Sequence, residues 1–281
     1  MKKQRKLFCE ISPFTYKISL YKCILLRKLR DLFSGDRFAK KKVLEKMPII
    51  IYKHNSLIRR KLGNVDLQLQ ENKATNLSIA APKVNGIIIK PGETFSFWHL
   101  VGEATEKKGY KTGLTIKQGS TSSGVGGGMC QFTNLIHWMI LHTPLDIIEH
   151  HHHDSIDLFP DFGRQVPFGT GTSVAYNYLD YRFKNNTNQD FQIIVYTTDE
   201  YLCGEIRTNN ELEQSYHIDC EDEYFSREDN VVYRNNKIFR RIIDKKTGNQ
   251  VSKELIKSNH AKVMYDTSNL DIIENELAEN T

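Results

Sequence analysis

The residues with the clearest chemical potential are a run of glycines and the cysteine that follows it. Gly126–Gly128 precede Cys130 by two residues, and apolar residues recur at helical spacing from there to His142. Glycines let the backbone approach a ligand closely, and the first turn of a helix presents unpaired N–H groups that lower the pKa of a thiol. The sequence therefore presents Cys130 as a candidate nucleophile, with the N–H groups from Gly128 to Gln131 as an oxyanion site. A small buried cysteine beside a tight loop is the alternative.

A histidine cluster follows this helix at a distance that brings it back to the cysteine. The helix is about 18 Å long, and a strand returning after Pro144 covers that length in about six residues. Strand alternation then places three side chains on one face: Glu149, His151 and His153. We therefore predict that His151 or His153 takes the proton from Cys130, and that Glu149 orients the imidazole.

Asp180 is a second candidate for orienting the histidine. It lies with Asn177 on a segment that is predicted to form the next strand. The alternative for both residues is an ordinary role on the strand surface or in turn capping, and this alternative is slightly favoured. His99, His137 and His142 are expected to be packing or surface residues.

Two further hypotheses stay open for the same region. In the first, four consecutive histidines (150–153), flanked by Glu149, Asp154 and Asp157, bind a metal ion, although the paired spacings typical of zinc sites are absent. In the second, the chain is a binding module without catalysis, in which the glycines approach a peptidoglycan fragment or partner and aromatic rings stack on it. The candidate binding residues are Gly126, Gly127, Gly128, Gln131, Trp98 and Tyr176.

Length and composition exclude several classes of protein. The chain has 281 residues, 39% of them hydrophobic, and five scattered cysteines. It is therefore neither a disordered chain nor a disulfide-stapled miniprotein. The glycine loop lacks the Lys-Ser/Thr ending of a P-loop and no dinucleotide-binding motif occurs, so we expect no cofactor. The region after residue 47 is acidic overall, so we expect no nucleic-acid partner.

The positive charge is concentrated at the N-terminus. Residues 1–47 carry 14 Lys and Arg against four Asp and Glu. Charged residues interrupt residues 7–29, so no apolar signal-peptide core is present, and we expect a cytoplasmic protein with free thiols. The basic segment is predicted to be a helix that either contacts anionic lipid at the inner face of the membrane or docks on the body. Docking is favoured, because a run of charges is usually a solvated face. The sequence does not define the oligomeric state.

The predicted architecture is α+β, with an antiparallel sheet packed on the helix that starts at Cys130. The predicted parts are an N-terminal helical segment (1–47, helical over 13–46), a central domain (48–208), a small β appendage (209–266) and an acidic tail (267–281). Within them, strands are expected at 49–53, 87–90, 93–100, 174–185, 191–197 and 202–208, and helical pieces at 57–63 and 76–81. Strands 174–185 and 191–197 are expected to pair through a turn at 185–186. The appendage is expected to turn at 235–236 and 245–248.

A series of short motifs in this chain resembles the VanW family. They occur in order over roughly residues 48–200: Pro91–Trp98, Lys108–Tyr110, Gly126–Gln131, Leu145–Glu149, Phe159–Asp161, Pro167–Gly171, Tyr176–Tyr178 and Asp180–Asn185. Gly-Gly-Gly-x-Cys-Gln and the following histidines, here His151 and His153, are the hallmark of that family.

The resemblance implies a role in glycopeptide (vancomycin) resistance or cell-envelope metabolism. Combined with the cysteine and histidines, it leads to the hypothesis of an amide hydrolase or acyl transferase that acts on a peptidoglycan precursor or another peptide. One position departs from the family: Gly171 stands where relatives tend to have aspartate. A simple Cys–His–Asp triad would therefore need Asp180 or Asn177 as a substitute.

Overall fold

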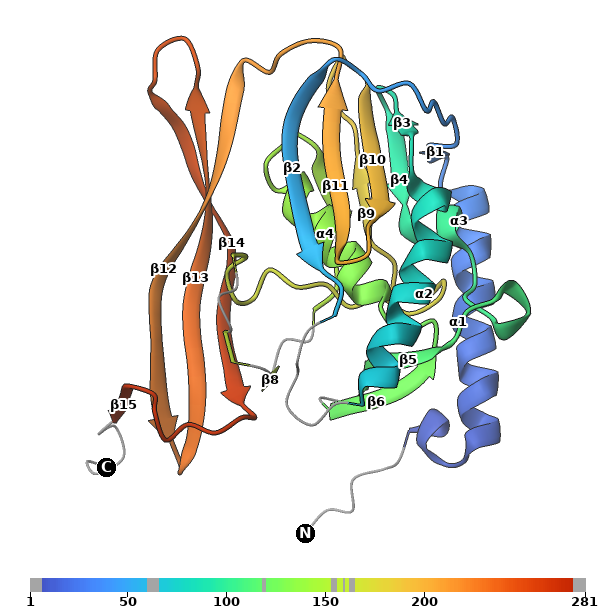
Figure 1. The fold of residues 1–281 in the computed structure, drawn as a ribbon, viewed down its shortest axis with the longest axis vertical. Coiled ribbons are helices and arrows are strands. Elements are labelled where there is room, and N and C mark those ends of the chain that lie inside the picture. Colours follow the sequence, from blue (N-terminus) through green and yellow to red (C-terminus); the bar gives the residue numbers. More distant parts are fainter. Residues whose placement is uncertain are drawn as a thin grey trace.

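The computed structural model describes residues 7–59, 66–117, 120–152, 156–158, 160–161 and 165–274 (Figure 1). The helices are α1 (Pro13–Phe33), α2 (Leu67–Val84), α3 (Phe97–Val101) and α4 (Met129–Ile140), with short 3-10 turns at Phe8–Glu10 and Glu106–Lys108. None of the helices in the described ranges is long and apolar enough to cross a bilayer.

Two four-stranded sheets and one hairpin form the body. The first sheet has the order β1 (Arg37–Phe38), β4 (Glu93–Ser96), β9 (Arg182–Lys184), β7 (Asp146–Glu149). The second has the order β2 (Ile49–Leu57), β11 (Tyr201–Thr208), β10 (Phe191–Thr197), β3 (Ile87–Ile89). The hairpin pairs β5 (Thr112–Lys117) with β6 (Ser120–Val125).

A third sheet of long strands stands beside the body, at the left of Figure 1. Its order is β15 (Ile272–Glu274), β12 (Gln214–Glu228), β13 (Val231–Asp244), β14 (Gln250–Val263), β8 (Ile156–Asp157). The parallel pairing of β14 with β8 connects it to the chain that leaves the histidine segment. The Asp157 carboxylate secures this connection, because it accepts hydrogen bonds from Arg234 at 3.3 Å and from the Tyr265 hydroxyl at 2.9 Å.

The core lies where α4 and α2 meet the two four-stranded sheets. Phe132, Leu135, Ile136 and Met139 recur along one face of α4 and are fully or almost fully buried. Burying such a side chain stabilises the fold by about 1.5–3 kcal/mol. Gly204 on β11 lies against this face, and a Cβ there would come within 2.6 Å of the Met139 side chain. The absence of a side chain on Gly204 lets the helix and the sheet approach closely.

The structure confirms the α+β class and several predicted elements. The structure contains the predicted helix that begins at the glycine run, the buried strand after Gly86, and the strands at 49–53 and 202–208. Strand β2 extends beyond its predicted end to Leu57. The turn at 245–248 is also confirmed, since it joins β13 to β14. The proposed domain boundaries stay a prediction.

The predicted helix over 13–46 is wrong beyond Phe33. Ser34 and Gly35, the latter in the left-handed region at φ +73°, end α1. The chain then enters the sheet, where β1 pairs in parallel with β4 and Ala39 is buried in the core. The last third of the basic segment is thus part of the body.

Two other predicted elements change type. The helix predicted over 57–63 is wrong at its start, because Leu57 ends strand β2; residues 60–63 lie outside the described residues. The helix predicted over 76–81 is part of the longer helix α2. The predicted strand 93–100 stops at Ser96, whose hydroxyl accepts the amide N–H of His99 at 3.2 Å and caps α3. Serine favours this cap geometry over continuing a strand.

Two predicted hairpins are wrong because their asparagine pairs do not form turns. The predicted strand 174–185 is a strand only over β9, which lies in a different sheet from β10, and the Asn185 amide between them donates to the Ile89 carbonyl. Asn235 and Asn236 are buried inside β13 and hydrogen bond to neighbouring strands. The actual turn is at Asp229–Asn230, both at positive φ, as a tight hairpin requires.

Candidate functional site

The glycine run is packed against other backbone segments. A Cβ on Gly127 would lie 2.3 Å from the backbone of Gly113, and one on Gly128 would lie 2.6 Å from the Lys73 side chain. The Asn76 amide donates to the Gly127 carbonyl at 2.9 Å and so fixes the loop on α2. Gly128, at φ +110°, is the N-cap of α4. Close packing therefore requires glycine at positions 127 and 128, whether or not a ligand approaches the loop.

Cys130 is the second residue of α4 and is half-buried. Burial raises the pKa of its thiol, and the N–H groups of Val174 and of Cys130 itself, which favour the thiolate, offset that effect only in part. The resting form at neutral pH is therefore the thiol. A base must remove the proton before the sulfur can act as a nucleophile.

An extended segment, 172–174, separates Cys130 from the histidines. Its consecutive amides are divided between the two sides: the Ser173 N–H donates to the His151 carbonyl at 2.7 Å, and the Val174 N–H faces the Cys130 sulfur. Thr172 holds the segment on α4, because its N–H donates to the Asn134 side chain at 2.6 Å. The backbone of His151 and the Cys130 thiol are thus neighbours of the same short segment.

The described histidines alternate as predicted, with Glu149 and His151 on one side and His150 and His152 on the other, but the side that faces α4 is that of His150. A register shift between Ile147 and Glu149 places a bulge at the end of β7, and a bulge changes the face on which the following side chains lie. Glu149 and His151 do meet, at 3.0 Å, but their common side carries Arg27 of α1. Among the described residues, His151 makes no hydrogen bond to Cys130. His153 lies outside the described residues, so its catalytic role stays a prediction.

The histidine that faces α4 is His150. Its ring centroid lies 4.0 Å from that of His137, which is buried on α4, and 3.9 Å from that of His152. Burial, and then the nearby His150, His152 and Lys257, lower the pKa of His137 well below its ordinary value. His137 is therefore a neutral packing residue, as predicted. Its Nδ1 lies 3.1 Å from the Tyr181 hydroxyl.

The other groups proposed for a metal site lie apart from these rings. Glu149 binds Arg27, and Asp157 binds Arg234 in the third sheet, while Asp154 is outside the described residues. Within the ranges given above, no group of three or more His, Cys, Asp and Glu is arranged to hold a metal ion.

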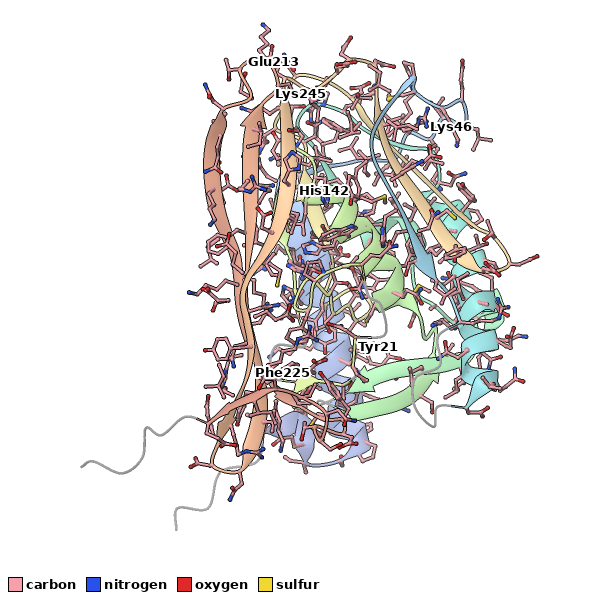
Figure 2. All side chains as sticks on the ribbon, turned by 60° about the vertical axis from the view of Figure 1, so that its left-hand side comes forward. Tyr21, Lys46, His142, Glu213, Phe225 and Lys245 are labelled. Atoms are coloured by element: carbon pink, nitrogen blue, oxygen red, sulfur yellow. The ribbon has the colours of Figure 1, made fainter. Side chains whose placement is uncertain are left out.

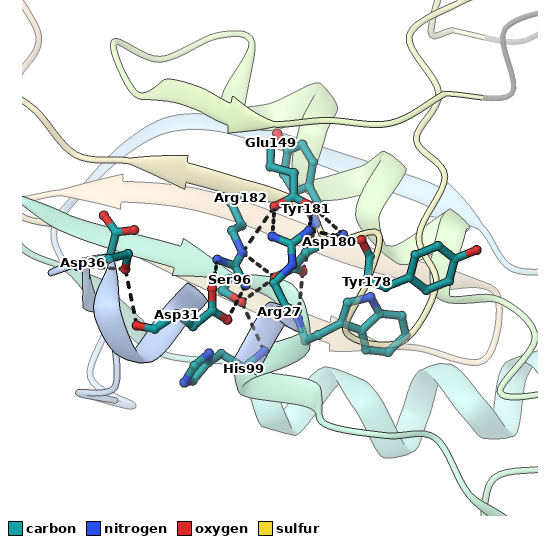
Figure 3. Close-up of polar contacts among 12 residues, drawn as sticks. Arg27, Asp31, Asp36, Ser96, His99, Glu149, Tyr178, Asp180, Tyr181 and Arg182 are labelled. Atoms are coloured by element: carbon teal, nitrogen blue, oxygen red, sulfur yellow. Dashed lines mark hydrogen bonds and ion pairs between the residues drawn. The ribbon is translucent and has the colours of Figure 1, made fainter. Parts of the chain in front are cut away.

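Glu149 and Asp180 belong to a network of ion pairs that attaches α1 to the body (Figure 3). Arg27 makes a bidentate pair with Glu149 at 2.5 and 2.6 Å, and Arg182 makes one with Asp31 at 2.7 and 2.8 Å. The Arg182 Nε also donates to Asp180 at 2.7 Å.

Asp180 is the centre of this network, and it is completely buried. In addition to Arg182, its carboxylate accepts the Ser96 hydroxyl at 2.5 Å and the amide N–H groups of Trp98 and Tyr181 at 3.0 and 2.9 Å. These contacts tie the start of α3 to the segment before β9. The contacts of Asp180 are those of a structural anchor, and its catalytic role stays a prediction.

The remaining candidate binding residues are mostly engaged within the fold. The Gln131 amide donates to the Ser56 hydroxyl and the Leu57 carbonyl at 2.9 and 2.8 Å, and so fixes the start of α4 to β2. Trp98 is 6% exposed, donates its indole N–H to the Leu179 carbonyl, and meets Tyr176 edge to face. The half-buried Tyr176 is the more accessible ring of the two.

A cavity of about 640 Å³ lies away from Cys130, between β2 and the first half of β12. Its walls include Tyr52, Trp138 and His142, and the Tyr52 and His142 rings stack at 3.7 Å. Burial is the main cause that lowers the pKa of His142 to about 4. Figure 2 shows His142 below Lys245, which also lines this cavity. No sequence motif indicated it, because its two walls lie about 160 residues apart in the chain.

Comparison with known proteins defines the class to which this glycine–cysteine site belongs. Residues 72–207 match the family model described as VanW like protein. The chain is 33% identical over 233 residues to the vancomycin B-type resistance protein VanW of Enterococcus faecalis, which covers 83% of this chain and 84% of that protein. The chain therefore belongs to the VanW family.

A second relative matches a smaller part of the chain. The protein YoaR of Bacillus subtilis is 32% identical over 126 residues, which is 44% of this chain and 39% of that protein. No solved structure matches this chain.

The ion pair between Glu149 and Arg27 leads to a prediction about acid stability. Burial raises the pKa of Glu149, but Arg27, His151 and the Asp180 amide together lower it more, so it lies below the ordinary value of 4.5. Because the folded-state pKa is depressed, this stabilisation is present above pH 4.5 and is lost as the pH falls further. In urea unfolding at pH 7, the free energy of unfolding of the native chain should exceed that of Glu149→Gln, and this difference should shrink below pH 4.5. A difference that is constant with pH would contradict the charge pair.

The half-buried Cys130 thiol, with its raised pKa, leads to a second prediction, on reactivity. At pH 7.5, iodoacetamide should alkylate the exposed Cys23 at least about tenfold faster than Cys130, since only the thiolate reacts. The rate at Cys130 should rise as the pH increases beyond 9. Peptide mass spectrometry after timed quenching measures both rates in one sample. Faster labelling of Cys130 near pH 6.5 would instead show an activated thiolate in the free protein.

Proposed function

We propose that this VanW family member acts in glycopeptide resistance or cell-envelope metabolism as a Cys130-dependent amide hydrolase or acyl transferase. The observation that carries the proposal is the position of Cys130 in the first turn of α4, where its sulfur meets the Val174 N–H. The backbone of His151 lies on the other side of segment 172–174 and accepts the Ser173 N–H. Helix N-termini stabilise developing negative charge. The relationship to the vancomycin B-type resistance protein supports the cell-wall context.

In the proposed reaction a peptide amide is the substrate. His153 takes the Cys130 proton, since the His151 imidazole pairs with Glu149 beside Arg27, and the sulfur attacks the carbonyl carbon. The negative oxygen of the tetrahedral intermediate receives hydrogen bonds from N–H groups between Gly128 and Gln131. The C–N bond then breaks, the imidazolium returns its proton to the leaving amine, and a thioester remains on Cys130. Water or an acceptor amine attacks the thioester and releases the free thiol.

A non-catalytic binding module is the second candidate. The specific observations that favour it are the raised pKa of the Cys130 thiol and the use of Glu149 and Asp180 in ion pairs with arginines. In that case the same region would bind a peptidoglycan-derived peptide without cleaving it. For either candidate we propose a peptide precursor met on the cytoplasmic side as the ligand.

Trapping of the acyl intermediate distinguishes the two candidates. The full chain is incubated with a soluble muramyl-pentapeptide precursor and quenched in acid, and its intact mass is measured. An enzyme should gain the mass of an acyl group, hydroxylamine should remove it, and Cys130→Ala should abolish it. The matched control is Cys203→Ala, which removes a buried cysteine from β11 and should leave the adduct unchanged.

A different pair of results would contradict the acyl-transfer proposal. The acyl-transfer proposal would be rejected, and the binding module supported, if the native chain forms no adduct and Cys130→Ala still binds the precursor in calorimetry. Circular dichroism of each variant confirms that it is folded.

A further inference from the structure

The outward face of α1 carries a continuous row of large apolar side chains. They are Phe14, Ile18, Tyr21, Leu25, Leu29 and Leu32, and each is between 42% and 74% exposed. At 3.6 residues per turn, these positions fall within an arc of roughly 80° along the whole helix. We call this row the α1 apolar stripe. The preceding residues Leu7, Phe8 and Ile11 are exposed as well.

The stripe is not the side by which α1 attaches to the body. Arg27 and Asp31 make the attachment through their ion pairs with Glu149 and Arg182, and they lie roughly 140° around the helix from the stripe. Figure 1 shows α1 at the right-hand side of the molecule, away from the third sheet. The docked helix thus presents its apolar side outward, which is the reverse of an ordinary surface helix.

The charges beside the stripe all have one sign. Lys17, Lys22 and Lys28 border the stripe and are exposed, while the single acidic residue of α1, Asp31, is paired with Arg182. An apolar face bordered by exposed lysines is the pattern of helices that lie in the interface of an anionic bilayer.

We propose that the α1 apolar stripe docks this protein on an anionic membrane surface, with the helix lying parallel to the bilayer. The apolar side chains enter the interface, and the flanking bases contact lipid headgroups. A second copy of the chain is a poorer occupant, because two α1 helices packed through their stripes would bring like charges together in either orientation. The proposal is independent of the chemistry at Cys130.

Vesicle co-sedimentation of the full chain tests the proposal. Vesicles of phosphatidylcholine with about one-third phosphatidylglycerol should bind at least about tenfold more protein than phosphatidylcholine alone, and high salt should reduce this binding. The double variant Leu25→Gln/Leu32→Gln should reduce the bound fraction at least about fivefold. Its matched control is Val251→Gln/Leu255→Gln, which changes two exposed apolar residues of β14 (each 56% exposed) and should bind like the native chain.

Three results would overturn the proposal. A specific membrane-docking face would be excluded if the stripe variant and the β14 control lose binding equally. It would also be excluded if the native chain does not bind the anionic vesicles. A lipid-free dimer by light scattering that the stripe variant alone converts to a monomer would assign the stripe to a second copy instead. Because the substituted residues are exposed, unchanged circular dichroism and melting temperature verify that each variant is folded.

Discussion

The bidentate pairs of Arg182 with Asp31 and of Arg27 with Glu149 are the interactions on which the arrangement of this protein depends. They join α1 to strands that follow it by more than 100 residues, and all four side chains are largely removed from water. Removing one partner of such a pair leaves a buried charge without compensation, at a cost of about 3–5 kcal/mol. Asp180 adds a third contact to Arg182 and connects the pair to α3. The network therefore fixes the orientation of α1, including the side that faces outward.

The same network constrains the cysteine site. Glu149 ends β7, so its ion pair with Arg27 fixes the point from which the histidine segment departs. His151 then contacts Ser173, whose neighbour Val174 meets the Cys130 sulfur. On the other side, Asn76 and Gln131 fix the glycine run and the start of α4. These contacts fix the backbone on both sides of Cys130.

The sequence predicted those features that depend on local patterns. The periodicity after Cys130 defined α4, and the apolar run after Gly86 defined β3, because both signals lie within a few residues. The pairing of Glu149 with His151 also followed from alternation. The bulge at Ile147 could not be predicted, since it depends on pairing with β9, and it turned His150 rather than His151 toward α4. The partner of Arg27 lies 122 residues away, so no local pattern identified the anchoring role of Glu149. The outward direction of the α1 apolar stripe could not be predicted either, because it depends on the same distant ion pairs.

A double-mutant cycle at Asp31 and Arg182 tests most directly whether these pairs organise the structure. Urea unfolding gives the free energy for the native chain, Asp31→Ala, Arg182→Ala and the double variant. We predict a coupling energy of at least about 1.5 kcal/mol, with the double variant much less destabilised than the sum of the single ones. Additive losses would contradict the account, because they would mean that α1 is held on the body by other contacts.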